Sequence, residues 1–77
     1  MNIEEFMHHF AEQFVDTDVN VFQAGTIFHE LDEYSSLIAL SIICMIDEEY
    51  DVSINGDDMK SAVTIADLFN IVKNKKN

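Results

Sequence analysis

Seventy-seven residues, 48% of them apolar, are enough for one small domain over residues 1–77 and leave no room for a second. Fifteen acidic residues against four lysines give a formal net charge of −11, which repels nucleic acids and anionic membranes and attracts proteins with a basic patch. The chain starts without a basic and apolar leader and has no apolar run long enough to span a bilayer, so we expect a cytoplasmic protein.

The first predicted element is an amphipathic helix over residues 2–14. Its apolar residues recur at spacings of three and four, which places them on one face. Asn2 is a suitable N-cap, and Glu4 and Glu5 lie in the first turn, where the helix dipole favours negative charge. His8 and His9 are adjacent and point in different directions, so we interpret them as surface residues and not as a metal pair.

Residues 16–20, DTDVN, imitate the start of a calcium-binding loop. The imitation fails because Val21 stands where such a loop needs glycine and Ile27 stands where it needs a bidentate glutamate. We therefore predict no metal site. Over residues 16–35 the apolar residues lack a sustained period, which predicts a long loop pinned to the core. Loops of this length in small domains are often functional.

The second predicted helix begins at Ser36, with Ser35 as its N-cap, and ends near Tyr50. It is apolar on more than one side. The residues predicted to face the core are Leu37, Leu40, Ile43, Cys44 and Ile46. A second stripe, which the rest of so small a domain can hardly cover, consists of Ile38, Ile42 and Met45 and is predicted to be exposed. The alternative is a helix buried on all sides. We interpret Cys44, the only cysteine, as a buried thiol.

Two more helices are predicted in the last third of the chain. Gly56 marks a break, and a short helix follows over residues 57–62. Thr64 then caps a final helix, with Asp67 as its partner in a shortened capping box. The predicted fold class is therefore all-α, with four helices, a long loop between the first two helices and a short third helix.

The order of a Phe-rich first helix, a long loop, Ser36-Leu37 opening an apolar helix, then DEEYDVSI and a late VTIADLFNIV resembles acyl carrier proteins over essentially the whole chain. The resemblance implies a four-helix bundle of the acyl-carrier type and a serine esterified by 4'-phosphopantetheine. That serine is Ser36, directly before leucine. Ser35 is the less favoured alternative, because it takes the place of the family's aspartate and also fits the N-cap role.

The resemblance implies a carrier and not an enzyme, with no catalytic residues of its own. A phosphopantetheinyl transferase would modify Ser36 with coenzyme A, and an acyl or aminoacyl group would travel as a thioester on the arm. The chain departs from the family pattern in three places. Ser35 stands where the family has aspartate, Glu33 and Tyr34 stand where glycine and a small residue are common, and Ser41 stands where glutamate is frequent. They leave the cargo open among fatty, polyketide, hydroxyacyl and aminoacyl groups.

The resemblance also implies a docking surface on the second helix of a monomer, for loading ligases and synthases with basic patches. The predicted apolar contacts are Leu37, Ile38, Ile42 and Met45. The predicted steering charges are Asp47, Glu48, Glu49, Asp51, Asp57 and Asp58. A sheltered cargo would lie between helices, near Leu37, Leu40, Ile43, Ile54, Ala62 and Ile65.

Two other interpretations stay open. One is a carrier-fold protein that never receives the arm and serves as a protein-interaction module, which the missing aspartate before Ser36 favours. The other is an EF-hand-like or other small helical regulator. Catalysis by a serine of this chain is disfavoured, because the sequence offers neither an oriented base nor a nucleophile elbow.

Overall fold

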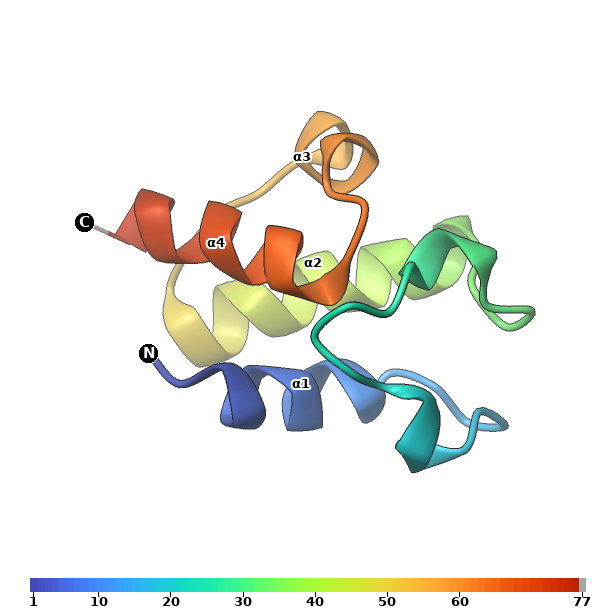
Figure 1. The fold of residues 1–77 in the computed structure, drawn as a ribbon. Helices are drawn as coiled ribbons and strands as arrows, with labels where there is room; N and C mark the ends of the chain where they lie inside the picture. The colour runs from blue at the N-terminus through green and yellow to red at the C-terminus, as the bar shows by residue number, and fades with distance from the viewer. Residues whose placement is uncertain (77) are drawn as a thin grey trace.

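The structure is a computed structural model that describes residues 1–76, and over this range it contains four α-helices and no β-strand (Figure 1). The helices are α1 (Ile3–Ala11), α2 (Ser36–Tyr50), α3 (Gly56–Ser61) and α4 (Ile65–Lys76). Two 3-10 turns, Val19–Val21 and Phe28–Glu30, lie in the long connection between α1 and α2. The predicted all-α class, long first connection and short third helix are confirmed. Within the described residues, no helix is both long and apolar enough to cross a membrane.

Helix α1 begins as predicted and ends earlier. The side-chain oxygen of Asn2 accepts hydrogen bonds from the N–H groups of Glu4 (2.8 Å) and Glu5 (3.1 Å), so the cap is confirmed. The regular helix ends at Ala11 and not at Phe14. A turn follows in which the N–H of Phe14 donates to the carbonyl of Ala11 at 3.0 Å. This turn still brings the Phe14 ring into the core.

Phenylalanines hold the connection between α1 and α2 against the core. Phe10 of α1 is fully buried, and its ring centroid lies 5.5 Å from Phe14, 6.0 Å from Phe22 and 5.4 Å from Phe28. Aromatic pairs at these separations contribute beyond the apolar area they bury. The prediction of a long loop pinned to the core is therefore confirmed.

Glu33 joins the two ends of this connection. Its carboxylate accepts hydrogen bonds from the N–H groups of Val15 (2.6 Å) and Asp16 (2.9 Å) and from the hydroxyl of Thr17 (2.7 Å). These bonds, that of Val15 first, hold the pKa of Glu33 below its ordinary value because they favour the charged carboxylate. The chain that leaves α1 is thus fastened beside the chain that enters α2.

Helix α2 faces the core with a different side from the predicted one. Ile42 and Ile46 are fully buried and Met45 is 6% exposed, whereas Leu37 and Leu40 are 75% and 58% exposed. The prediction that Ile42 and Met45 form an exposed stripe is therefore wrong, and these two residues are core. The predictions that Leu37, Leu40 and Cys44 face the core are wrong as well, because all three are exposed.

The physical reason is the composition of this helix. From Leu37 to Ile46 every residue except Ser41 is apolar, so the period of the pattern does not select one inward face. The inward face is selected instead by what packs against it, a core that includes Phe6, Phe10 and the buried side of α4. Ile38 and Ile43 flank the buried residues and are half-buried.

Capping boxes begin the last two helices. Asn55 and Asp58 exchange side-chain and backbone hydrogen bonds of 2.9 and 3.1 Å, so α3 starts at Gly56 and not after it. Thr64 and Asp67 do the same at 3.1 and 3.0 Å, which confirms the predicted cap of α4. Hydrogen bonds from the N–H groups of Thr64 and Val63, that of Thr64 first, lower the pKa of the Asp67 carboxyl.

The long connection is also tied to the start of α4. The N–H of Ala66 donates to the carbonyl of Ala24 at 2.9 Å, and that of Ile65 donates to the carbonyl of Thr26 at 3.2 Å. In Figure 1 this part of the chain passes beside the first turn of α4. At the other end of α4, Lys76 Nζ donates to the carbonyl of Tyr50 at 2.6 Å, which fastens α4 to the end of α2.

Candidate functional site

The two serines at the start of α2 have different environments. The Ser35 hydroxyl accepts a hydrogen bond of 3.3 Å from the N–H of Ile38, so Ser35 is the N-cap, as predicted. Ser36 is the first residue of the helix and is exposed. Within residues 1–76 its hydroxyl takes part in no side-chain hydrogen bond. Ser36 therefore presents a free hydroxyl, whereas that of Ser35 is occupied by capping.

The first turn of α2 suits a negatively charged group on Ser36. An α-helix leaves its first N–H groups without an intrahelical acceptor, and the Ser35 hydroxyl takes only that of Ile38. The N–H groups of Ser36 and Leu37 stay available, and they lie at the positive end of the helix dipole. This environment favours a negatively charged substituent on Ser36 over a neutral one.

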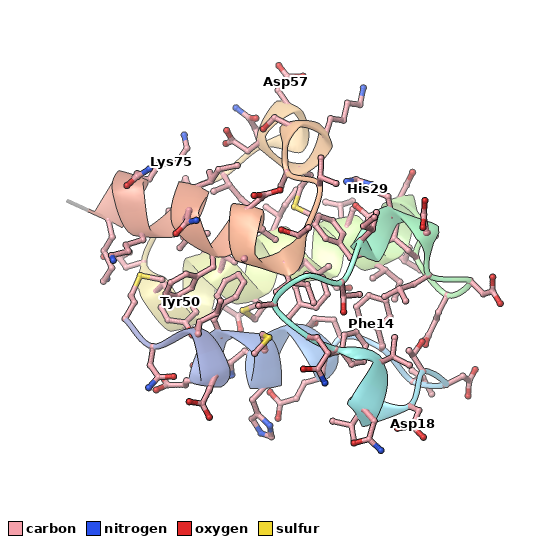
Figure 2. The ribbon with its side chains drawn as sticks, viewed as in Figure 1. Phe14, Asp18, His29, Tyr50, Asp57 and Lys75 are labelled. Carbon is pink, nitrogen blue, oxygen red and sulfur yellow. The ribbon has the colours of Figure 1, made fainter. Side chains whose placement is uncertain are left out.

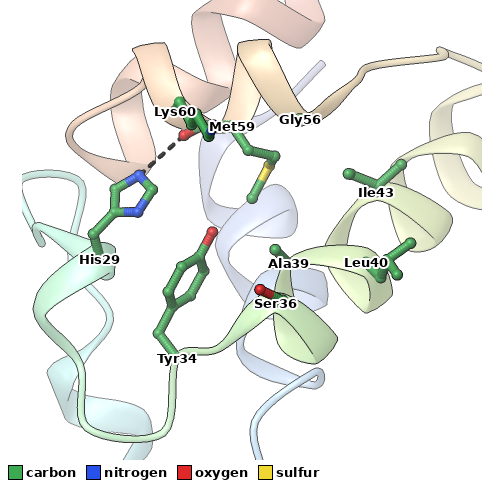
Figure 3. Close-up of a pocket in the computed structure, with 9 residues that line it drawn as sticks. All are labelled: His29, Tyr34, Ser36, Ala39, Leu40, Ile43, Gly56, Met59 and Lys60. Carbon is green, nitrogen blue, oxygen red and sulfur yellow. Dashed lines mark hydrogen bonds between the residues drawn. The ribbon is translucent and has the colours of Figure 1, made fainter.

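A groove of about 490 Å³ lies beside Ser36, between the start of α2, α3 and the second 3-10 turn (Figure 3). Four apolar side chains form much of its wall, those of Ala39, Leu40, Ile43 and Met59. Its polar residues are His29, Tyr34, Ser36 and Lys60. A mostly apolar groove with a few polar groups is typical of sites that bind small organic molecules.

This groove differs from the predicted cargo space. Of the six residues predicted to surround cargo, Leu40 and Ile43 line it. Ile54, Ala62 and Ile65 are instead buried in the core. The deviation has the same cause as the rotation of α2, since the predicted space assumed that the Leu37 side of the helix faces inward.

His29 connects the second 3-10 turn to the end of α3. Its Nε2 atom lies 3.0 Å from the carbonyl oxygens of both Met59 and Ala62. Both partners are acceptors, so Nε2 carries a hydrogen and donates it. Sequence reasoning missed this role, because no spacing in the sequence relates a lone histidine to carbonyls about thirty residues later.

Tyr34 lies against this histidine at the approach to α2. Its ring forms edge contacts with Phe28 (5.5 Å between centroids, 67°) and with His29 (5.0 Å, 72°). Tyr34 is half-buried, and desolvation raises the pKa of its hydroxyl above the ordinary value. At neutral pH the hydroxyl therefore keeps its proton and is available as a donor.

The outward face of α2 combines apolar and acidic residues. Leu37, Leu40 and Cys44 are exposed along its first part, and Asp47 and Glu48 are exposed on its last turns. A second groove, of about 450 Å³, runs between this face and α1. The structure thus brings the predicted Leu37 together with predicted acids. Met45 is buried but still lines this second groove, whereas Ile42 is fully buried in the core.

The remaining acidic residues of the predicted docking surface differ in exposure and in whether a cation lies nearby. Glu49 and Asp51 are exposed at the end of α2, and Asp57 points outward from α3 (Figure 2). Asp58 is half-buried, serves in the capping box of α3 and lies 3.4 Å from Lys75 Nζ. Its charge is therefore partly compensated and contributes less to an exposed acidic field than the others.

The two histidines of α1 lie near carboxylates, and their ring centroids are 6.2 Å apart. His9 is half-buried, and its ring nitrogens lie 3.4 Å from a Glu12 oxygen and 3.7 Å from oxygens of Glu5 and Glu49. His8 is exposed, with its Nε2 3.7 Å from Glu12. In the part of the chain that the structure describes, no group of three His, Cys, Asp or Glu side chains is placed to hold a metal ion.

Comparison with known proteins adds no relative. No protein-family model, curated protein or solved structure matches this chain. A functional interpretation therefore depends on the sequence pattern and on the geometry around Ser36.

Proposed function

We propose that this chain is an acyl carrier protein, which holds an acyl or aminoacyl group as a thioester on a 4'-phosphopantetheine arm attached to Ser36. The observation that carries the proposal is the position of Ser36. It is an exposed serine at the first turn of a long helix, directly after the N-cap residue Ser35 and at the edge of an apolar groove. The helical bundle with its long first connection supports the acyl-carrier type of fold.

The residues present fit such an arm. Attachment would form a bond from Ser36 Oγ to the phosphorus of the pantetheine phosphate of coenzyme A. The bond from that phosphorus to the bridging pyrophosphate oxygen would break, so that adenosine 3',5'-bisphosphate leaves, and a base of the transferase would take the Ser36 proton. The free N–H groups of Ser36 and Leu37 and the helix dipole favour the resulting phosphodiester charge. When bound, the arm supplies a terminal thiol that carries acyl groups as thioesters. Cys44 is too far along α2 to replace it, since it lies two turns beyond Ser36.

The exposed face of α2 supports docking to basic enzymes. The acidic residues Asp47 and Glu48 would steer a transferase, ligase or synthase towards the helix, and Leu37 and Leu40 would supply the apolar contact. In this proposal Leu40 takes over the role predicted for Ile42 and Met45. Steering by charge with a small apolar contact gives fast, weak binding, as a shuttle requires.

Intact-protein mass spectrometry tests the proposal directly. The chain is incubated with coenzyme A and a phosphopantetheinyl transferase of broad specificity, as wild type, Ser36→Ala and Ser35→Ala. We expect one phosphopantetheine on the wild type and on Ser35→Ala, and none on Ser36→Ala. If several transferases add nothing to the wild type, the unmodified interaction module becomes the better interpretation.

A further inference from the structure

The Tyr34 hydroxyl is a polar group of the groove without a partner in the described part of the chain. Figure 3 shows the ring rising from the approach to α2 into the space between α2 and α3, with its hydroxyl at the tip. No hydrogen bond of this hydroxyl is formed within residues 1–76, and the side chain is half-buried. A hydroxyl that faces an apolar groove gains free energy when an occupant supplies a well-placed acceptor.

The direction of this hydroxyl is fixed by a chain of contacts. The carbonyls of Met59 and Ala62 hold the His29 ring through Nε2, and His29 together with Phe28 holds the Tyr34 ring between two edge contacts. The hydroxyl is therefore positioned before any occupant arrives. A preorganised donor loses little entropy on binding, which is how a single polar group makes an apolar groove selective.

Position and charge identify the occupant. Ser36 itself lines the groove, so any group esterified to it begins at the groove's edge and has a high effective concentration there. No acidic residue of the described range 1–76 lines the groove. Among the residues that line the groove, Lys60 is the one permanent cation. The suitable occupant thus has methyl groups for the apolar walls and oxygen acceptors for Tyr34 and Lys60.

Resting on the carrier function proposed above, we propose that this groove docks the inner half of the arm itself, with Tyr34 donating a hydrogen bond to one of its oxygens. That half of 4'-phosphopantetheine has two geminal methyl groups, a hydroxyl and an amide carbonyl, and it follows the phosphodiester directly. Ala39, Ile43 and Met59 would contact the methyl groups, and Lys60 lies on the wall opposite α2. Tyr34 is then a positioning residue that keeps the arm bound to the carrier while no enzyme is docked.

The experiment is NMR of the isotopically labelled chain with its arm attached. We expect nuclear Overhauser effects between the geminal methyl groups of the arm and the side chains of Tyr34 and Met59. Tyr34→Phe should lower the docked population by roughly two- to tenfold, which is the effect of one neutral hydrogen bond. Chemical-shift differences between the apo and holo forms at Ala39 and Met59 should shrink in proportion.

Tyr50→Phe is the matched control. It also removes a tyrosine hydroxyl that has no hydrogen-bond partner, but at the far end of α2, so it should leave the arm contacts unchanged. A holo form with no arm contacts in the groove would overturn the docking proposal and leave the carrier function intact. Contacts that are equal in wild type and Tyr34→Phe would overturn the role of Tyr34. Failure of the transferase to add any mass would overturn the carrier function and the docking proposal together.

An acylated form of the protein distinguishes binding of the arm in the groove from binding of its acyl group there. After loading with hexanoyl-coenzyme A by the same transferase, the geminal methyl contacts should persist with Tyr34 and Met59. Their replacement by contacts from the hexanoyl chain would overturn the proposal, because the groove would then be a cargo site.

Discussion

The Oε2 atom of Glu33 lies 2.6 Å from the backbone nitrogen of Val15, eighteen residues earlier in the chain. This contact closes the connection between α1 and α2 with one side chain. The same carboxylate also binds the next N–H and the hydroxyl of Thr17, so three donors meet one anion. Since Glu33 lies just before the cap of α2, the closure helps to set where Tyr34 and Ser36 are presented.

Glu33→Gln should destabilise the fold at neutral pH and flatten its acid dependence. In the folded state hydrogen bonds, that from Val15 first, lower the pKa of Glu33 below its ordinary value. A depressed carboxyl pKa stabilises the fold above the unfolded pKa, and this contribution is lost as pH falls through the folded pKa. Urea denaturation at a series of pH values from neutral to acid measures the effect.

Glu30→Gln is the control for this series. Glu30 is an exposed carboxylate of the same connection, and it forms no side-chain hydrogen bond within residues 1–76. Its variant should keep the acid dependence of the wild type. Equal slopes of stability against pH for wild type and Glu33→Gln would contradict the role assigned to the closure.

Ile42→Ala should cost about 2–5 kcal/mol of unfolding free energy, because it opens a cavity at a fully buried site. Leu37→Ala removes a side chain that is 75% exposed and should change stability by no more than about 0.5 kcal/mol. Urea denaturation of the two variants checks the orientation of α2. The reverse order of effects would mean that the predicted face, and not the observed one, is the core face.

The caps of the helices and the buried face of α2 differ in how well the sequence predicts them. The caps were predictable at Asn2, Ser35 and Thr64, because a cap depends on residues within one turn of each other. The face of α2 was not predictable, because an almost uniformly apolar helix has no period that distinguishes one side. Only the packing of the whole chain decides whether Ile42 or Leu40 is buried.

In the candidate site, too, the sequence predicts the local features and misses the contacts between distant segments. Ser36 followed from a local pattern and lies at the predicted place, the first residue of α2. Met59 and Lys60 were missed as neighbours of Ser36, because α3 reaches the groove through the fold and not through spacing. Tyr34 was noticed only as a departure from the family pattern, and its contacts with His29 and Phe28 required the structure.

Ser35→Ala should cost about 0.5–2 kcal/mol, since it removes the hydroxyl that caps α2 through Ile38. Ser36→Ala should leave the unfolding free energy nearly unchanged, because that hydroxyl holds nothing within the described residues. Ser35→Asp restores an N-cap acceptor and should recover the stability lost in Ser35→Ala. Thermal and urea unfolding of the three variants measures these differences. A larger loss in Ser36→Ala than in Ser35→Ala would exchange the roles of the two serines.

Cys44 should react with iodoacetamide in the folded protein. Its side chain is exposed on the outward face of α2 beside Leu40, whereas a buried thiol would be protected until unfolding. Mass spectrometry after alkylation in buffer and in urea should give labelling at comparable rates. Bound partner enzyme should slow the labelling, because the proposed docking face includes Leu37 and Leu40 next to this thiol. Protection of Cys44 in the free protein would instead place this side of α2 against the core, and would refute both the observed orientation and the docking face derived from it.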